Sequence, residues 1–180
     1  MKQLGSTFFA KPSLEVAKSL LGAKLCFANK SGWITETEAY MGKQDPASHA
    51  ASGKTARNAV MFDQAGTLYV YMIYGMHHCL NIVTEAKDQP AAVLIRGLYT
   101  EQGLHLDGPG KLCKQLGIDK RLNQTCCSND QSAVRLYTWA KPLNLAMQQT
   151  PRIGIKKGKT LPWRFVLSPK GLDQLKKEIS

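Results

Sequence analysis

The stretch from Gly66 to Ile82, GTLYVYMIYGMHHCLNI, constrains the fold of this chain more than any other segment. It is rich in β-branched and aromatic residues and breaks at Gly75. This pattern predicts two strands, 68–73 and 78–84, joined by a turn around Tyr74 to Met76. We expect a tyrosine beside a glycine at the tip of such a hairpin to expose its ring, which can then wedge into a stack of bases.

Other segments extend this picture to a mixed antiparallel sheet. Leu25 and Phe27 lead through a turn into a strand expected from Trp33 to about Tyr40, and further strands are expected at 91–98 and 163–167. Helices are expected at three places: after an N-cap at Ser13, after the glycines at 108–110, and through Leu172, Leu175 and Ile179 at the end of the chain.

The charge of the chain favours a polyanionic partner. Lys and Arg number 24 against 13 Asp and Glu, a net charge of +11 at pH 7, and each phosphate neutralised by such a cation releases a counterion. The densest basic cluster is Arg152, Lys156, Lys157 and Lys159. The alternative interpretation is a basic solvated surface that serves solubility.

The five cysteines are odd in number and show no CxxC spacing, so reduced thiols in a reducing cytoplasm are expected. The four histidines give no recognisable zinc pattern, and we predict no metal. No signal sequence or membrane span is evident. GxSxG, Walker A, GxGxxG and HExxH signatures are absent, and nothing requires a cofactor.

Two carboxylates in the segment ETEAY are candidates for acid–base chemistry. Period-two alternation predicts that Ile34, Glu36, Glu38 and Tyr40 share one face of their strand. Nearby carboxylates that resist ionising together raise the pKa of one of them, although such a pair is also common on a solvated strand. Arg96, on the strand expected at 91–98, would pair with a carboxylate, hold a water, or form a structural salt bridge.

Several polar and aromatic side chains have both a structural and a functional interpretation. Tyr69 and Tyr71 alternate with apolar residues, as in an aromatic strip of a sheet core. Asn81, between Leu80 and Ile82, needs a partner from the backbone or from a ligand. His49 lies in the long polar loop expected at 42–63, a length that is more often functional than decorative.

A series of segments lies in a fixed order along most of the chain. The segments are ETEAY at 36–40, the loop with His49 and RN at 57–58, MF at 61–62, the string at 66–82, VLIRGL around Arg96, GPGKLC from Gly108, PRIGI at 151–155 and PWRF at 162–165. Taken together, these segments resemble the alkyladenine DNA glycosylase family, also called 3-methyladenine DNA glycosylases.

The resemblance implies a monofunctional glycosylase that excises damaged purines from DNA and leaves an abasic site. Glu38 would be the general base that activates water, and Arg96 would hold that water together with the backbone carbonyl of Ile153. Glu36 would be a neighbour of the catalytic group. Because the family mechanism assigns no lysine as a Schiff-base nucleophile, no lyase activity is expected.

The same resemblance implies a base pocket and a DNA wedge. The extruded base would stack between Tyr40 on one side and the pair His49 and Tyr71 on the other. Tyr74 would fill the gap left by the flipped nucleotide. Asn81 would lie against the purine edge and disfavour guanine, whose exocyclic amino group would clash.

The sequence therefore predicts a single α+β domain over residues 1–180, with a curved, mainly antiparallel sheet, flanking short helices and a protruding β-hairpin. The expected partner is double-stranded DNA that contains damaged purines, with no cofactor, no membrane partner, a monomeric state and a cytoplasmic, nucleoid-associated location. The rival interpretation is a noncatalytic nucleic-acid-binding module of the same fold. A hydrolase of free nucleosides is a weaker third, because it would leave the basic patch and the wedge without a purpose.

Overall fold

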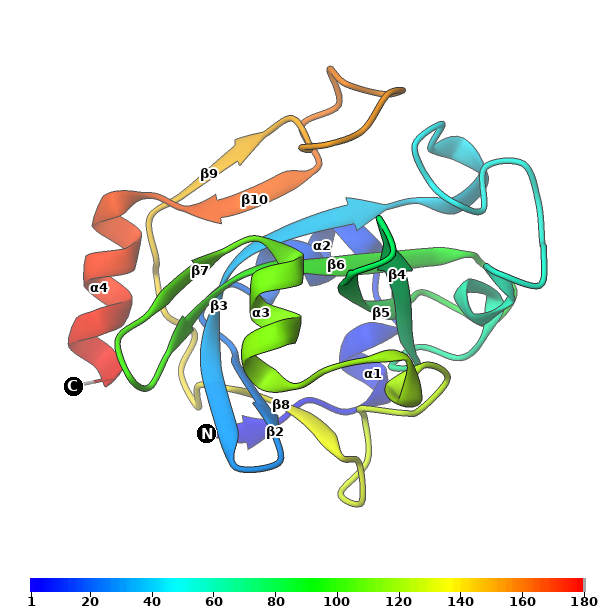
Figure 1. Cartoon of the computed structure of the whole chain (residues 1–180). Coiled ribbons are helices and arrows are strands. Elements are labelled where there is room, and N and C mark those ends of the chain that lie inside the picture. The colour runs from blue at the N-terminus through cyan, green and yellow to red at the C-terminus, as the bar shows by residue number, and fades with distance from the viewer. Residues whose placement is uncertain (180) are drawn as a thin grey trace.

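The computed structural model describes residues 1–179 and shows a mixed α+β domain built on one bent antiparallel sheet of ten strands (Figure 1). The path β1-β8-β2-β3-β6-β5-β4 forms the sheet, with β10 and β7 added beside β3 and β6, and β9 beside β10. The strands are β1 (Lys2–Gln3), β2 (Lys24–Phe27), β3 (Lys30–Tyr40), β4 (Leu68–Ile73), β5 (His77–Thr84), β6 (Ala91–Thr100), β7 (His105–Asp107), β8 (Val134–Thr138), β9 (Met147–Thr150) and β10 (Arg164–Leu167). The expected fold class is confirmed.

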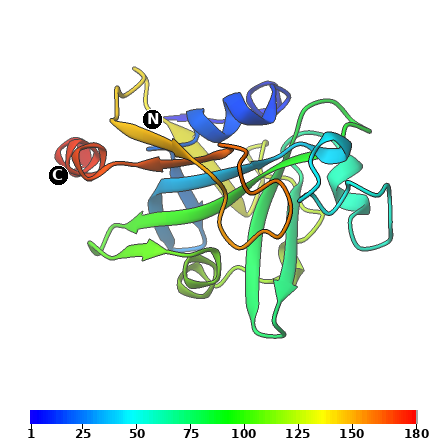
Figure 2. The same ribbon diagram turned by 90° about the horizontal axis from the view of Figure 1, so that it is seen from above.

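Short helices flank the sheet on both faces. They are α1 (Ser6–Phe9), α2 (Ser13–Ser19), α3 (Pro109–Leu116) and α4 (Pro169–Ile179), with 3-10 turns at Gly42–Gln44, Ala59–Phe62 and Lys120–Leu122. Both views place α2 and α3 on opposite sides of β3 and β6 (Figures 1 and 2). Thr37 of β3 is fully buried and donates to the carbonyl of Ala17 on α2, so the α2 face of this strand is core, whereas Glu38 and Tyr40 line a cavity on the other face.

The prediction that Ser13 is an N-cap is wrong. Pro12 holds the cap position, and Ser13 is the first residue of α2. Its buried hydroxyl donates to Glu85 Oε1 at 2.6 Å, and its backbone N–H reaches the same oxygen at 3.1 Å. A long-range tie to the end of β5 thus replaces the local capping bond.

The prediction that Ile34 shares a face with Glu36 and Glu38 is also wrong. The pairing of β3 with β6 shifts register between Ile34 and Glu36 and again between Glu36 and Thr37. An irregularity of this kind breaks period-two alternation because an extra residue enters the strand. Ile34 consequently lies in the main hydrophobic core together with Ala39, while Glu38 faces a cavity on the other side of the sheet.

The β4–β5 hairpin has the expected strands and an exposed tip, and it projects from the body of the molecule (Figure 2). Tyr74 and Gly75 both have positive φ, 51° and 68°, and Met76 N–H donates to Ile73 O at 3.2 Å. Positive φ at both central residues is what a type I′ turn requires. Tyr74 is 86% exposed, so a bulky ring is held outward on a backbone conformation that bulky residues rarely adopt.

The sequence interpretation missed β1, β7, β8 and β9. Each is short, and β9 is the polar segment MQQT, which is ordered by pairing along its whole length with β10. The final helix was expected, and its cap is present, since Ser168 Oγ accepts the N–H of Gly171 at 3.2 Å. Within residues 1–179, no helix combines the length and the apolar character that crossing a membrane demands.

Candidate active site

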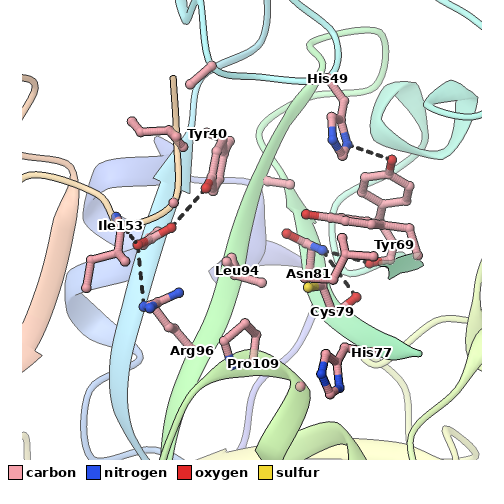
Figure 3. Close-up of a pocket in the computed structure, with 18 of the residues that line it drawn as sticks. Tyr40, His49, Tyr69, His77, Cys79, Asn81, Leu94, Arg96, Pro109 and Ile153 are labelled. Carbon is pink, nitrogen blue, oxygen red and sulfur yellow. Dashed lines mark hydrogen bonds and ion pairs between the residues drawn. The ribbon is translucent and has the colours of Figure 1, made fainter. Parts of the chain in front are cut away.

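A cavity of about 710 Å³ opens on the face of β3 and β6 opposite α2 (Figure 3). Its walls come from β3, β4, β5, β6, the N-terminus of α3, and the loops 46–49 and 153–157. Figure 3 shows Tyr40, Arg96 and Ile153 converging on one carboxylate at one side of the cavity, with His49 and Tyr69 at the other. The carboxylate is that of Glu38, because its oxygens accept from Tyr40 and Ile153 and lie beside Arg96.

Glu38 is fully buried yet lines the cavity. Its Oε2 accepts the Tyr40 hydroxyl at 2.9 Å, its Oε1 accepts the backbone N–H of Ile153 at 2.9 Å, and Arg96 Nε lies 3.6 Å from Oε1. Pairing of β3 with β6 on one side and with β10 on the other fixes the backbone at this position. The side chain is therefore held at both oxygens on a rigid strand.

Burial raises the pKa of Glu38 above its usual range. The Ile153 N–H, the charge of Arg96 and the Tyr40 hydroxyl oppose this rise, and the nearby charge of Glu36 adds to it. Burial, and then the Glu38 charge, raise the pKa of Tyr40, so that its hydroxyl stays a hydrogen-bond donor. Glu38 is thus a carboxylate with a raised proton affinity at the edge of a cavity, which is the property that a general base requires.

Glu36 has a different environment from Glu38. Its Oε1 accepts Arg164 Nε at 2.5 Å and lies 2.7 Å from Arg96 Nε. The Arg96 contact is an ion pair without a well-angled hydrogen bond, since Arg96 Nε–H has no acceptor in line among the described residues. Arg164 also donates from Nη1 to Thr150 Oγ1 at 2.8 Å. Two guanidinium groups therefore neutralise Glu36, and it anchors Arg96 beside Glu38.

Three rings form the wall opposite Glu38. His49 Nδ1 lies 3.0 Å from the Tyr69 hydroxyl, and the His49 ring meets Tyr71 edge to face at 4.8 Å between centroids. Tyr69 and Tyr71 are tilted neighbours at 5.0 Å. Burial, together with the charge of Arg57, lowers the pKa of His49, which favours a neutral imidazole. The wall is aromatic and uncharged, as stacking on an electron-poor ring requires.

Asn81 lies on the cavity floor and is almost fully buried. Its Nδ2 donates to the carbonyl of Tyr69 at 3.0 Å and, more weakly, to that of Cys79 at 3.4 Å. The backbone thus supplies the partner that the buried amide needs. Because Nδ2 makes both bonds, the amide is oriented with Oδ1 away from the two carbonyls. Burial raises the pKa of the neighbouring Cys79 thiol to about 11, so this thiol stays protonated.

The prediction that Arg152 belongs to a basic surface cluster is wrong. Arg152 is 5% exposed and pairs with the buried Asp45 through both Nη atoms. The cavity rim nevertheless carries Lys111, Lys156 and Lys157, together with Tyr74 from the hairpin. The mouth of the cavity is therefore basic, with an exposed ring beside it.

The structure brings together Glu38, Arg96, Ile153, Tyr40, His49, Tyr71 and Asn81 around the cavity, and Tyr74 at its rim. Ile153 contacts Glu38 through its backbone N–H, whereas the family resemblance gave a role to its carbonyl, which would hold the water. The interpretation of Tyr69 as a core residue is confirmed, since it is buried in a hydrophobic cluster, but sequence reasoning missed that Tyr69 also lines the cavity, and it missed Asp45. The signal for Tyr69 was available, because it shares a strand face with Tyr71.

The geometry defines a class of site. A cavity of this volume is typical of a small-molecule or base pocket. Its aromatic wall suits a flat ring, and its buried carboxylate can activate a water. No group of three or more metal-ligating side chains occurs within residues 1–179.

Comparison with known proteins gives the family. A sequence model described as Methylpurine-DNA glycosylase (MPG) matches residues 7–170. A protein of Sodalis glossinidius is 52% identical over 164 residues, 90% of this chain and 95% of its own length. Proteins of Wolbachia pipientis subsp. Culex pipiens (strain wPip) and Rickettsia peacockii (strain Rustic) are 51% and 47% identical, over 90% and 89% of this chain and 88% and 87% of their own lengths.

All three relatives carry the name "Putative 3-methyladenine DNA glycosylase". Because the family model covers nearly the whole chain and the relatives are about half identical, the chain belongs to the methylpurine-DNA glycosylase family. The resemblance seen in the sequence is confirmed.

Proposed function

We propose that this DNA glycosylase is monofunctional, and that it flips alkylated or deaminated purines of the 3-methyladenine, 7-methylguanine and hypoxanthine type out of duplex DNA and excises them by hydrolysis in base excision repair. The observation that carries the proposal is a fully buried Glu38 held at both oxygens, facing an aromatic-walled cavity with a basic rim. The rival of a noncatalytic module predicted an exposed Glu38 without an aromatic pocket beside it, so the geometry favours the enzyme.

In the proposed reaction, Glu38 accepts a proton from water as the water oxygen bonds to C1′ of the sugar. The bond from C1′ to the purine nitrogen breaks, and its electrons leave with the base. Arg96, and the carbonyl of Ile153, would hold the water, and Glu36 keeps Arg96 in place. A cationic alkylated base leaves as a neutral purine, so Glu38 and one water suffice for it. A neutral base such as hypoxanthine would leave as an anion that takes up a proton, and it therefore leaves less readily.

The proposed pocket stacks the extruded purine between Tyr40 and the pair formed by His49 and Tyr71. A neutral His49 avoids repelling a cationic base, and its contact with Tyr69 holds the imidazole in place. Tyr74 would enter the duplex from the minor groove and occupy the gap. Lys156 and Lys157 on the rim suit a phosphate backbone, and we expect DNA affinity to fall with salt.

The proposal is tested with a duplex that contains hypoxanthine, analysed before and after alkali, beside an electrophoretic binding assay. We expect strand breaks only after alkali, since an abasic site is the product. Breaks without alkali would contradict the monofunctional assignment, and binding without breaks would support the noncatalytic module. The monomeric state and the cytoplasmic location stay predictions.

The pH dependence of excision should follow Glu38. The working form is the ionised carboxylate, so the single-turnover rate on a cationic base rises with pH until Glu38 is ionised. Because burial raises its pKa, the acidic limb of the profile should lie above pH 4.5, the ordinary value for this group. The other polar side chains that face this carboxylate are those of Arg96, Tyr40, Glu36 and Cys79. The rate is measured only at pH values at which the protein is folded. An excision rate that stays constant as the pH is lowered past 4.5 would contradict the role of Glu38.

Asn81 should control the rejection of guanine. Its amide is fixed by the carbonyls of Tyr69 and Cys79, so it cannot swing away from the exocyclic amino group of a guanine. Asn81→Ser removes this obstacle, and we expect the release of 7-methylguanine relative to 3-methyladenine to rise about 10-fold. The two bases are quantified from one methylated duplex. Asn123→Ser is the control, because Asn123 bonds the backbone of β4 at Val70 and does not line the cavity. An unchanged ratio in Asn81→Ser would exclude this role.

A further inference from the structure

A buried ion pair lies directly behind the wall of the cavity. Arg152 donates to Asp45 through Nη1 at 2.5 Å and Nη2 at 2.7 Å, and neither side chain has exposed surface. Nη1 also donates to the backbone carbonyl of Ala39 at 2.9 Å. Asp45 in turn accepts the N–H groups of Met41 at 3.2 Å and Ala47 at 3.0 Å. The pair therefore joins β3, the loop that follows it and the loop that follows β9.

The guanidinium of Arg152 also lies over two aromatic rings. Its central carbon is 4.6 Å from the centroid of Tyr40 and 4.9 Å from that of Trp163. Tyr40 lines the cavity and Arg152 does not, so the guanidinium supports the Tyr40 ring from behind. A planar cation on an aromatic face is a favourable contact, and more so in a dry environment.

The position of Arg152 in the chain connects this pair to Glu38. The next residue is Ile153, whose N–H donates to Glu38 Oε1 at 2.9 Å, and Gly154 then turns the chain at φ 77°. Fixing the Arg152 side chain thus fixes the start of the loop that carries this N–H. Both groups that hold the carboxylate, the Ile153 amide and the Tyr40 hydroxyl, are in this way attached to one guanidinium.

A purely structural explanation of the pair is weak on energetic grounds. Desolvating two charges cancels most of their attraction, and well-packed apolar residues often replace such pairs without loss of stability. Arg152 contacts Asp45, the Ala39 carbonyl and the Tyr40 ring at the same time. Apolar side chains could not make these three contacts, and so could not fix the positions of these groups relative to one another.

Resting on the proposed function, we propose that Arg152, held by Asp45, is a positioning residue for base excision, which keeps the Ile153 amide on Glu38 and supports the Tyr40 ring against the extruded base. Arg152 touches neither the base nor the water in this arrangement. Replacing Arg152 should therefore change the titration of Glu38 and the excision rate more than the affinity for DNA.

The first test needs no catalysis. Carboxyl ¹³C NMR follows the titration of Glu38 in the free protein, with Glu38→Gln to assign the signal, and hydrogen exchange follows the Ile153 amide. The Ile153 N–H lowers the pKa of Glu38, as do the charge of Arg96 and the Tyr40 hydroxyl. The charge of Glu36 raises this pKa, and the Cys79 thiol also lies near the carboxylate. In Arg152→Lys we expect Ile153 to exchange at least about 10-fold faster and Glu38 to titrate at a higher pH than in the wild type.

The second test is single-turnover excision by the same variants. Arg152→Lys keeps the charge but loses the two-pronged contact, and we expect an excision rate lower by about 10- to 100-fold, an acidic limb moved to higher pH, and little change in DNA affinity. Asp45→Asn combined with Arg152→Gln replaces the ion pair by neutral amides and leaves no unpaired buried charge. We expect this double variant to show the same changes even where it folds stably.

Leu175→Ala is the control, because Leu175 is a buried residue of α4 in a separate hydrophobic cluster and does not line the cavity. It should lower the melting temperature without moving the Glu38 titration, the Ile153 exchange or the pH profile. The proposal is overturned if Arg152→Lys behaves like Leu175→Ala in these three measurements. A wild-type protein that releases no base would contradict the proposed function instead, and the NMR measurements would still decide whether the pair positions Ile153 and Glu38.

Discussion

Replacing Glu38 by glutamine should reduce base excision by about 10²- to 10⁴-fold, the contribution usual for a general base. Gln keeps the size of the side chain and its Oε1 can still accept the Ile153 N–H, but it cannot take a proton from water. Since Glu38 is fully buried and presents no surface to a phosphate backbone, affinity for a damaged duplex should be retained. The rate is measured in single turnover with enzyme in excess, so that product release does not contribute.

The matched control for this variant is Glu85→Gln. Glu85 accepts hydrogen bonds from Ser13 at the start of α2, and it does not line the cavity. We expect Glu85→Gln to change stability more than excision. If the excision rate of Glu38→Gln lies within about 10-fold of the wild-type rate, the loss is smaller than the removal of a general base causes. Another group must then activate the water.

Replacing Tyr74 by asparagine should separate function from stability. Asn adopts positive φ more readily than a bulky residue, so the turn at Tyr74 and Gly75 should form at least as easily and the melting temperature should not fall. The variant lacks the ring that would fill the gap in the duplex, and flipping a base costs a few kcal/mol of stacking. Excision should therefore fall by about 10- to 100-fold, most of all for bases that remain paired.

Two variants of the same hairpin complete this comparison. Tyr74→Phe keeps the ring and should keep most of the activity. Met76→Ala removes another exposed apolar side chain of the tip, 70% exposed, and should have the smaller effect if the ring at position 74 is the wedge. Equal losses in Tyr74→Asn and Met76→Ala would instead indicate that the hairpin contributes only general apolar contact with DNA.

Local sequence patterns were sufficient to predict several parts of the structure. The hairpin with its exposed tyrosine followed from strand propensity interrupted at Gly75, and the common face of Glu38 and Tyr40 followed from alternation, because no irregularity lies between those two residues. Their bond through the Tyr40 hydroxyl shows that this face is continuous. The assignment of roles to Arg96 and His49 depended on the family resemblance.

Other parts depend on contacts between distant segments, which periodicity does not encode. The bulge that turns Ile34 into the core arises in the pairing with β6, and a single strand gives no sign of it. Arg152 looks like one more surface cation beside three lysines until the fold places Asp45 within reach. β9 is a polar stretch that becomes a strand because β10 pairs with it.

The central claim, that this protein hydrolyses the bond between damaged purines and DNA, is tested most directly by chromatography of the free bases released from a methylated duplex. Wild type and Glu38→Gln are compared at equal occupancy of the DNA. We predict free 3-methyladenine from the wild type, little from Glu38→Gln, and equal binding by both. Binding of damaged DNA by the wild type without any free base would contradict the enzyme and leave a noncatalytic DNA-binding module.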